Sequence, residues 1–451
     1  MLTSDQNRKI NEIVEEFKEA ADFYRMEYSE DLMGMFRDFG CMLLLKCKVD
    51  TEGKADLERL LEGRHKLKGT VKRQLMTVSE ELAQLWEPGE QDGSGDTGEY
   101  EGSQNVREMF QTALEEIFHF CLYSKGGKNR YLLPEETAKP LLRLLTFPEG
   151  MMAGNEGLVV LDTQCGAGSA LMAASRYLKN LRLMGYEKDE EMWAAAVIMS
   201  QLSGLEMELH LEDGARADLY ESCDLVISNP VYGTDTIKDE ELIDQLPGEL
   251  KTVRGRYHME LIRSMQALNF DGKAMLIVPN SFLFANRTES MKVRKWLLQS
   301  YSLEAIISLP EDTFMYSGVR SGVMVFSKPF MSGGWEGHTQ RVLYYNLEKQ
   351  EDKEKQQKEY ERLEEVWSQR DSYYGKWERS RREKTVENRN GIKVPANWQY
   401  NSFWFADVDQ IEAGKWNLLP ENYRPVLRSP SEPRADQSGN RGPGSSFAGD
   451  A

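Results

Sequence analysis

The sequence predicts an α/β fold with a mostly parallel, twisted sheet, preceded by an α-helical domain and followed by a charged helical segment. Three observations carry this prediction. Short apolar runs that end on polar residues recur through the middle of the chain, segments with helical periodicity separate them, and the first run leads into a glycine-rich turn. Apolar runs bounded by turn residues are typical of strands buried on both faces of a parallel sheet, and parallel strands require crossover connections.

Length and composition exclude several classes of protein. With 451 residues, of which 40% are hydrophobic, the chain can bury one large core and one smaller domain. It contains no apolar run of about 18 residues, so we expect no membrane span. The polar start, Met1 to Asn11, lacks the apolar segment of a signal peptide and predicts a cytoplasmic protein. Five cysteines and five histidines are scattered without paired spacing, which argues against a disulfide framework or a metal site.

Residues 1–122 are predicted to form the helical domain. Apolar residues recur there at helical spacing: Ile10, Ile13, Val14, Phe17, Leu32, Met35, Phe36, Phe39, Phe110, Leu114, Ile117, Phe118 and Cys121. The acidic, glycine-rich stretch 87–104 interrupts this pattern and predicts a flexible loop. We interpret the apolar stripes on either side of the loop as core packing.

The main part of the sheet is assigned to residues 123–347. Before its first strand the sequence predicts a loop and then a helix that begins near Pro134, since proline is tolerated in the first turn of a helix. After the strand at 158–161, Gly166 and Gly168 let the backbone approach a ligand, and the helix that begins near Ser169 directs its free N–H groups to the same place. Taken alone, such a loop is compatible with an ordinary turn, or with a nicotinamide, flavin or sulfonium cofactor.

Three further strands are predicted at 181–187, 207–213 and 224–228. The first ends on Glu187, 25 residues after Asp162, where an open α/β sheet places the carboxylate that holds a ribose. The second ends on Asp213, and the third runs into Asn229. Because the carboxyl ends of parallel strands meet at one edge of a sheet, these residues describe one crevice. Each carboxylate taken alone is equally compatible with a helix cap or a surface acid.

The character of the sequence changes after the central sheet. An added strand is predicted at 341–347, and 348–385 carry dense charges of both signs, which predicts a solvated helical segment or, alternatively, a partner surface. Aromatic residues return over 386–427, which we assign to the C-terminal part of the sheet domain. Residues 428–451, rich in Ser, Gly, Pro and Arg, are predicted to be disordered.

Two motifs carry a resemblance to a known family. The turns after the first and fourth strands read Asp162-Thr-Gln-Cys165-Gly166-Ala-Gly168 and Asn229-Pro230-Val231-Tyr232, and 274–280 read Ala-Met-Leu-Ile-Val-Pro-Asn. These stretches resemble the S-adenosylmethionine-dependent amino-group methyltransferases, and in particular the modification subunits of type I restriction-modification systems, which methylate adenine N6 in DNA. The resemblance covers roughly residues 105–425. Thr163 and Val231 depart from it, because the family usually has proline at both positions.

The resemblance implies a Rossmann-like methyltransferase fold, S-adenosylmethionine as cofactor and DNA as substrate. The cofactor-binding residues that it implies are Asp162, Cys165, Gly166, Gly168, Glu187 and Asp213, with Tyr131 and Pro134 covering the methionine end. Asp162 is expected near the amino acid group, Glu187 on the ribose hydroxyls and Asp213 near the adenine amine. No segment is left over for an independent target-recognition domain. We therefore expect a hetero-oligomer with a separate specificity subunit, and a restriction subunit as a further candidate partner.

The reaction gives Asn229, Pro230 and Tyr232 their expected catalytic roles. An exocyclic purine amine is a poor nucleophile because its lone pair is delocalised into the ring. Acceptors on its N–H bonds stabilise the charge that develops during attack, and the Asn229 side-chain oxygen and the Pro230 carbonyl are positioned to be those acceptors. Tyr232 is expected to stack on the base, which must be flipped out of the duplex. The reaction requires no metal, and an ordinary turn is the alternative interpretation of the Asn-Pro pair.

Two alternative functions remain open from the sequence. The same motif suits any planar amine, so a protein glutamine amide or RNA is an alternative substrate. A cofactor-binding subunit with weak catalysis is the other alternative, because Thr163 and Val231 depart from the family pattern and the chain is acidic.

The formal net charge of −18 is unusual for a chain that binds DNA alone, since phosphate neutralisation supplies most of that affinity. Eight basic residues near Asn229 in the sequence are predicted to form a local basic rim: Lys251, Arg254, Arg256, Arg263, Arg287, Lys292, Arg294 and Lys295. The alternative is that they are solvated, or paired with acids such as Glu260 and Glu289.

Overall fold

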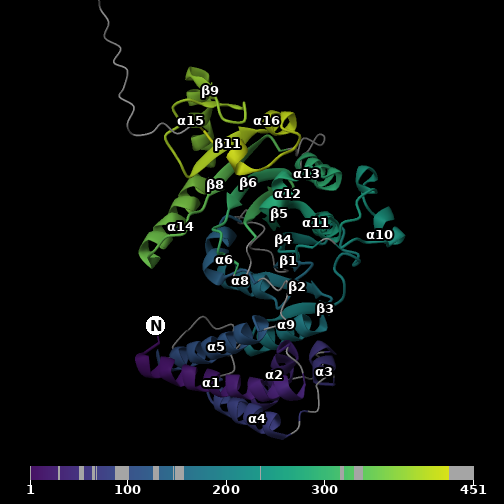
Figure 1. Cartoon of the computed structure of the whole chain (residues 1–451), viewed down its shortest axis with the longest axis vertical. Coiled ribbons are helices and arrows are strands. Elements are labelled where there is room, and N and C mark those ends of the chain that lie inside the picture. The colour runs from purple at the N-terminus through teal and green to yellow at the C-terminus, as the bar shows by residue number, and fades with distance from the viewer. Residues whose placement is uncertain are drawn as a thin grey trace, which may run out of the picture.

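The computed structural model describes residues 2–28, 31–49, 55–62, 67, 69–86, 101–124, 132–145, 147, 157–233, 235–314, 319–329 and 339–425. The tail predicted at 428–451, most of the loop predicted at 87–104, and Tyr131 lie outside these residues. A helical domain lies at one end of a large sheet, and the C-terminal helices lie at the other end (Figure 1).

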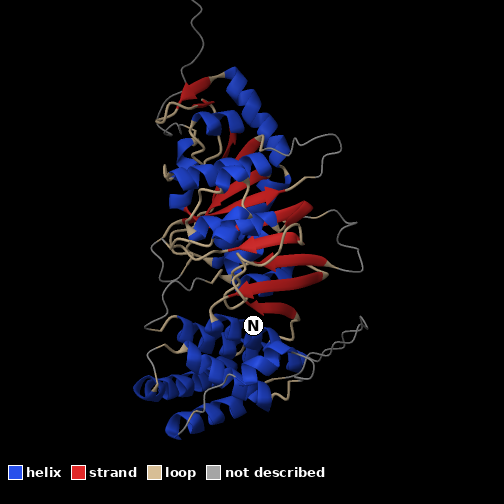
Figure 2. Ribbon diagram, turned by 90° about the vertical axis from the view of Figure 1, so that its right-hand side faces the viewer, coloured by secondary structure: helices blue, strands red, loops and turns tan. Residues whose placement is uncertain are grey.

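A nine-stranded sheet runs through the middle of the molecule (Figure 2). Its strands are β1 (Leu158–Asp162), β2 (Leu181–Glu187), β3 (Met207–Leu211), β4 (Cys223–Ser228), β5 (Leu268–Pro279), β6 (Ser302–Ser308), β7 (Ser321–Ser327), β8 (Arg341–Asn346) and β11 (Phe403–Asp407). The order is β11-β8-β6-β7-β5-β4-β1-β2-β3. Five of the eight neighbouring pairs are parallel, which confirms the predicted mostly parallel sheet. Strand β7 is inserted antiparallel between β5 and β6, and β11 pairs antiparallel with β8.

The predicted strands form where the apolar runs lie. Strand β2 has the predicted bounds, and β1 and β4 differ from them by one residue each. Strand β3 ends two residues before Asp213, so this acid lies in the loop after the strand. Burial explains the agreement, because Val160 and Leu161 point to opposite faces of the sheet and neither is exposed.

Helices cover both faces of the sheet (Figure 1). They are α6 (Glu135–Leu142), α8 (Ser169–Tyr177), α9 (Glu190–Leu202), α11 (Arg256–Gln266), α12 (Asn280–Phe284) and α13 (Thr288–Ser300). The short helix α10 (Glu240–Asp244) and a 3-10 turn at Gly248–Leu250 lie between β4 and α11 in the chain. Helices α8 and α9 pack along β1, β2 and β3, whereas α11 packs on β4 and β5. Helix α9 begins where Asp189 Oδ1 accepts the backbone N–H groups of Glu191 and Met192 at 3.1 and 3.0 Å.

The N-terminal domain consists of α1 (Ser4–Glu27), α2 (Met33–Lys46), α3 (Ala55–Glu62), α4 (Gly69–Ala83) and α5 (Glu101–Leu122). Helix α5 begins at Glu101, so the predicted flexible loop is wrong for residues 101–104. A helix that is held by an apolar face can extend into neighbouring polar residues, although those residues show no helical periodicity in the sequence. The domain packs on the sheet through α2, where Gly40 allows close approach to Ile198 of α9 and Arg37 pairs with Glu191 at 3.0 Å.

The C-terminal part consists of α14 (Lys353–Ser368), α15 (Arg370–Glu383), the hairpin of β9 (Thr385–Glu387) and β10 (Lys393–Pro395), α16 (Val408–Ala413) and a 3-10 turn at Pro420–Asn422. The charged segment is helical as predicted, but it is not solvated all round. Leu363, Val366, Trp367 and Trp377 are buried, and the ring of Trp377 meets that of Trp398 edge-on at 4.9 Å. Among the described helices, none is long and apolar enough to cross a membrane.

Candidate functional site

A pocket of about 470 Å³ opens at the carboxyl edge of the sheet. It is lined by Leu132, Leu133, Asp162, Thr163, Gln164, Cys165, Gly166, Ser169, Ala170, Glu187, Lys188, Asp189, Met192, Glu212, Asp213, Gly214, Asn229, Val231, Tyr232, Gly233, Asp235, Arg256, Tyr257 and Glu260. Loops after β1, β2, β3 and β4 therefore meet as the sequence predicts, and α11 adds a further wall. This is the position at which open α/β sheets bind their ligands.

The two glycines after β1 have different surroundings. Gly166 has φ +56° and lines the pocket, as predicted. Gly168 has φ +79° but is not among the lining residues. A Cβ on Gly168 would contact Met207 Cε at 3.4 Å and Ala196 Cβ at 3.6 Å. Both are ordinary contact distances, so the positive φ rather than a lack of space favours glycine here, and the predicted cofactor contact of Gly168 stays a prediction.

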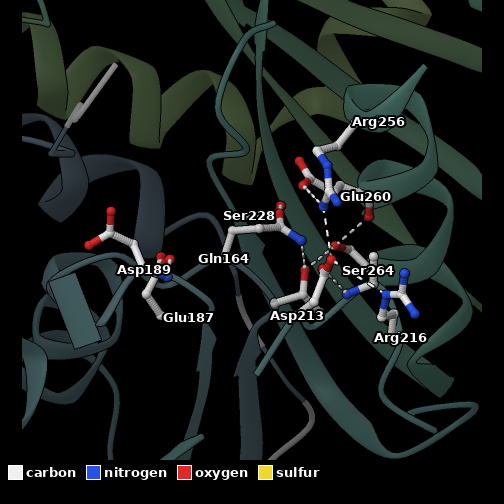
Figure 3. Close-up of polar contacts among 11 residues, drawn as sticks. Gln164, Glu187, Asp189, Asp213, Arg216, Ser228, Arg256, Glu260 and Ser264 are labelled. Carbon is white, nitrogen blue, oxygen red and sulfur yellow. Dashed lines mark hydrogen bonds and ion pairs between the residues drawn. The ribbon is translucent and has the colours of Figure 1, made fainter. Parts of the chain in front are cut away.

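Two of the predicted carboxylates hold the loops that surround the pocket. Asp162 Oδ1 accepts the Gln164 backbone N–H at 3.0 Å, and burial raises the pKa of Asp162 to about 7. Glu187 accepts the backbone N–H of Gly166 at 3.0 Å and that of Asp189 at 2.7 Å. Burial raises the pKa of Glu187 as well. Figure 3 shows Glu187 and Asp189 across the pocket from Gln164. Glu187 thus ties the glycine loop to the end of β2 while it lines the pocket.

The third predicted carboxylate is paired within the protein. Arg256 Nη1 donates to Asp213 Oδ2 at 2.9 Å and to Glu260 Oε1 at 3.4 Å (Figure 3). Burial raises the pKa of Glu260 to about 7. Sequence reasoning named Glu260 only as a pairing partner and missed its place in the pocket. The available signal was a lone acid between Met259 and Leu261, in a helix that must bury one side against the sheet.

The Asn-Pro motif follows β4 directly into the pocket. Asn229, Val231 and Tyr232 line it, whereas Pro230 is buried and is not among the lining residues. The Tyr232 hydroxyl lies 3.4 Å from Ser321 Oγ, and its ring meets Tyr257 edge-on at 5.8 Å. Val231, which stands in place of a family proline, is 49% exposed. The motif therefore places an amide and a phenol ring beside the glycine loop.

A chain of hydrogen bonds connects the two motifs. Ser228 Oγ donates to Gln164 Oε1 at 3.5 Å, and Gln164 Nε2 donates to Thr163 Oγ1 at 2.8 Å. Thr163 Oγ1 lies 2.5 Å from Ser264 Oγ, which donates to the Glu260 carbonyl at 2.8 Å. Gln164, Ser228 and Ser264 are visible together in Figure 3. Threonine in place of proline at position 163 thus supplies a hydroxyl link that proline lacks.

The remaining predicted cofactor residues divide between the pocket and its surroundings. Cys165 lines the pocket, and burial raises the pKa of its thiol well above the usual range, so it acts in packing rather than as a thiolate. Pro134 precedes α6 as its N-cap and is not among the lining residues, whereas Leu132 and Leu133 are. The cofactor contact of Pro134 stays a prediction, and Leu132 and Leu133 lie in the pocket directly before it.

The predicted basic rim is wrong for three of its eight members. Arg256 lies in the pocket. Arg263 is buried and donates to the carbonyls of Ala215 and Ala217 at 3.0 and 2.8 Å. Arg294 is fully buried and donates to the carbonyls of Trp416, Phe282 and Ala285. A helical arginine can reach backbone carbonyls of a neighbouring segment, and sequence alone does not show which carbonyls are close.

The chain matches a known protein family over the segment that forms this pocket. The model of the N-6 DNA methylase family matches residues 107–428. The type II restriction enzyme and methyltransferase RM.BcgI of Heyndrickxia coagulans is 26% identical over 213 residues, which are 43% of this chain and 31% of that protein. The methylase subunit of the type I restriction enzyme MjaVII of Methanocaldococcus jannaschii is 24% identical over 298 residues, 60% of this chain and 47% of that protein. The chain thus spans less than half the length of either curated relative.

The fold is shared with solved structures. The methyltransferase subunit of a type I restriction-modification system from Streptococcus thermophilus superposes with a TM-score of 0.57 at 16% identity. The superposition covers 92% of this chain and 99% of that one. At this identity the likeness concerns the fold alone.

The strand order and the pocket at the carboxyl edge define the class as an α/β protein of Rossmann-like topology, with the fold of the solved structure above. The family match spans every residue that lines the pocket. The chain belongs to the N-6 DNA methylase family.

Proposed function

We propose that the chain transfers a methyl group from S-adenosylmethionine to the N6 amine of adenine in DNA, as the modification subunit of a type I restriction-modification system. The observation that carries this proposal is the placement of Asn229 and Tyr232 in the same pocket as the glycine loop, inside the segment that matches the N-6 DNA methylase family. A separate specificity subunit sets the target sequence.

The charge of the pocket favours a sulfonium cofactor. Its lining includes seven carboxylates, from Asp162, Glu187, Asp189, Glu212, Asp213, Asp235 and Glu260, and two cations, from Lys188 and Arg256. S-adenosylmethionine carries a sulfonium and an ammonium group, whereas nicotinamide and flavin dinucleotides carry a pyrophosphate. An acidic pocket with an unoccupied acceptor on Glu260 suits the first and repels the others.

The protein's own groups act on the amine. The bound cofactor supplies an electrophilic methyl group. The Asn229 side-chain oxygen and the Pro230 carbonyl accept the amine N–H bonds and stabilise the positive charge that develops on nitrogen. The hydrogen-bonded series Ser228, Gln164, Thr163 ties the end of β4, directly before Asn229, to the loop after β1, so the acceptors keep their place relative to the cofactor. Tyr232 provides the aromatic face for a flipped base.

The net charge of the chain leads us to propose a second subunit that helps to bind DNA. The net charge is −18, and three of the eight residues of the predicted basic rim are buried or lie in the pocket. Five cations of this rim remain to neutralise phosphates on a chain of net charge −18, so we expect specific DNA affinity to require a partner. Type I modification subunits are named as parts of such assemblies among the proteins that this chain resembles.

Replacement of Asn229 by alanine tests the proposal. In an assay of methyl transfer to DNA with the specificity subunit present, Asn229→Ala should lower turnover by about a hundredfold or more, because one preorganised acceptor is worth about 3 kcal/mol in the barrier. Cofactor affinity, measured by calorimetry, should stay within about twofold. Asn269→Ala is the matched control, because Asn269 bonds Asp224 and does not line the pocket. Near-normal turnover of Asn229→Ala would show that the motif is only a turn.

A further inference from the structure

Helix α11 forms a polar wall of the pocket. Arg256, Tyr257 and Glu260 all line it. Tyr257 and Glu260 lie three residues apart, so their side chains project from the same face of the helix. Tyr257 is 7% exposed and Glu260 is 3% exposed. A phenol and a carboxyl are thus buried together at one side of the pocket.

Each of these side chains has one polar atom without a partner. Glu260 Oε1 accepts from Arg256, and the Glu260 carbonyl accepts from Ser264. Glu260 Oε2 and the Tyr257 hydroxyl are buried and have no hydrogen-bond partner among the residues that the structure describes. Buried polar atoms are nearly always paired, so two unpaired atoms on one helix face in a pocket indicate a ligand that pairs with both.

The two atoms have complementary roles. Burial raises the pKa of Tyr257 well above its usual range, so the hydroxyl keeps its proton and can donate. An ionised Glu260 oxygen accepts. A donor and an acceptor on one helix face in the pocket match the edge of adenine, where the exocyclic amine donates and the neighbouring ring nitrogen accepts. Hypoxanthine has the opposite pattern at this edge, because a carbonyl replaces the amine and the ring nitrogen carries a proton. The ring of Tyr232, edge-on to Tyr257, extends the aromatic surface beside them.

We propose that Tyr257 and Glu260 form an adenine-reading pair, with the Tyr257 hydroxyl donating to the ring nitrogen and Glu260 Oε2 accepting from the exocyclic amine. The inference rests on the proposed function, which brings adenine to this pocket from two sources. One source is the base of the cofactor, and the other is the flipped base of the target. The recognition chemistry is the same for both. Because the amine has two N–H bonds, in the target arm Glu260 Oε2 takes the place of the Pro230 carbonyl, which does not line the pocket, beside the Asn229 oxygen.

Two binding experiments distinguish the sources. In the first, S-adenosylhomocysteine and S-inosylhomocysteine are titrated calorimetrically into the full chain at about pH 8, above the pKa of Glu260, which burial raises to about 7. In the second, single strands of oligo-dA and oligo-dI are compared by fluorescence anisotropy with S-adenosylhomocysteine saturating. In the experiment that contains the adenine recognised by the pair, wild type should bind the adenine ligand at least tenfold more tightly than the inosine ligand.

The variants are Tyr257→Phe and Glu260→Gln. Each should weaken binding of the adenine ligand about tenfold in that arm. Glu260→Gln should also reduce the preference over the inosine ligand, because its amide N–H can donate to the hypoxanthine carbonyl. Tyr301→Phe is the matched control, since its buried hydroxyl already donates to the Met265 carbonyl. It should leave ligand affinity unchanged.

A stability measurement separates recognition from a structural role. Tyr257→Phe removes an unpaired buried hydroxyl, so the ligand-free variant should melt at the same temperature as wild type or higher. Tyr301→Phe should melt lower, because it breaks a hydrogen bond. A Tyr257→Phe variant that loses both stability and affinity would assign Tyr257 to packing and overturn the inference.

The two proposals fail in different ways. If wild type binds S-adenosylhomocysteine but Tyr257→Phe and Glu260→Gln retain its affinity and base preference in both arms, the adenine-reading pair is wrong and the cofactor assignment stands. If wild type does not bind S-adenosylhomocysteine at all, the proposed function is contradicted, and the pair falls with it.

Discussion

At the scale of single residues, the pocket contains acidic side chains whose burial disfavours the ionised form. Asp162 is 2% exposed, and burial raises its pKa from the ordinary 3.8 to about 7. The folded chain therefore holds this proton more tightly than the unfolded chain between about pH 4 and pH 7. The stability that the proton contributes is complete below about pH 4 and is lost as the pH rises through about 7. Glu260 acts in the same direction, because burial raises its pKa to about 7.

A calorimetric pH series tests this linkage. The melting temperature of the ligand-free chain should fall between about pH 4 and about pH 7, and it should fall less in Asp162→Asn, which has no charge to bury. The difference should reach a few kcal/mol in unfolding free energy, since each tenfold change in proton affinity is worth about 1.4 kcal/mol. Identical pH dependence in wild type and Asp162→Asn would refute a buried, proton-binding Asp162.

Gly166 should matter for the ligand more than for the fold. Its φ of +56° disfavours a side chain, yet a Cβ there would meet only Met192 Cε at 3.5 Å, an ordinary contact. Gly166→Val should therefore abolish binding of S-adenosylmethionine by filling the pocket, at a stability cost of about 1–2 kcal/mol. Gly204→Val is the matched control, because Gly204 has φ +67° and no neighbour within 4 Å. The control should show a similar stability loss with normal affinity, and calorimetry showing normal affinity in Gly166→Val would remove the cofactor assignment.

At the scale of elements, the strands were predictable and the partners of long side chains were not. An apolar run such as Leu158–Asp162 shows its burial directly in the sequence, and so β1 could be placed to within one residue. Arg294 has the same local appearance as an exposed helical arginine, but the carbonyls that it satisfies come from residues up to 122 positions away. The position of Glu260 likewise depends on how α11 packs on the sheet. Tertiary contacts determine which carbonyl or pocket such a side chain reaches, and the periodicity of the sequence carries no information about these contacts.

The contact between α2 and α9 gives a prediction at the same scale. A Cβ on Gly40 would lie 2.4 Å from Ile198 Cδ1, so Gly40→Ala forces the two helices apart. We expect a loss of about 1–3 kcal/mol in unfolding free energy, measured by urea denaturation. The same substitution at Gly375 in α15, where no atom lies within 4 Å, should instead stabilise by about 0.5–1 kcal/mol through helix propensity. A neutral Gly40→Ala would show that the helices pack less closely.

At the scale of the whole molecule, charge should govern the proposed encounter with DNA. Five residues of the predicted basic rim lie at exposed or half-buried positions: Lys251, Arg254, Arg287, Lys292 and Lys295. Lys251 also pairs with Asp244 at 3.4 Å, and Lys292 donates to Thr252 at 2.8 Å. The surface left to meet phosphates is therefore small.

DNA binding by the chain alone should be weak and indifferent to sequence. If the five remaining rim residues supply the phosphate contacts, the slope of log affinity against log salt should be no steeper than about −4.5. Fluorescence anisotropy at several salt concentrations measures it, and addition of the specificity subunit should increase both affinity and selectivity. Tight, site-selective binding by the purified chain would contradict the proposed division of labour between subunits.

Helix α9 contacts both the pocket and the N-terminal domain. Met192 lines the pocket, and the preceding residue, Glu191, holds Arg37 of the N-terminal domain. Ile198, two turns further on, packs where Gly40 leaves room. A rigid helix cannot shift one of these surfaces without the other. The N-terminal domain is therefore connected to the pocket through α9, and we expect any partner that tilts this domain to reshape one wall of the pocket.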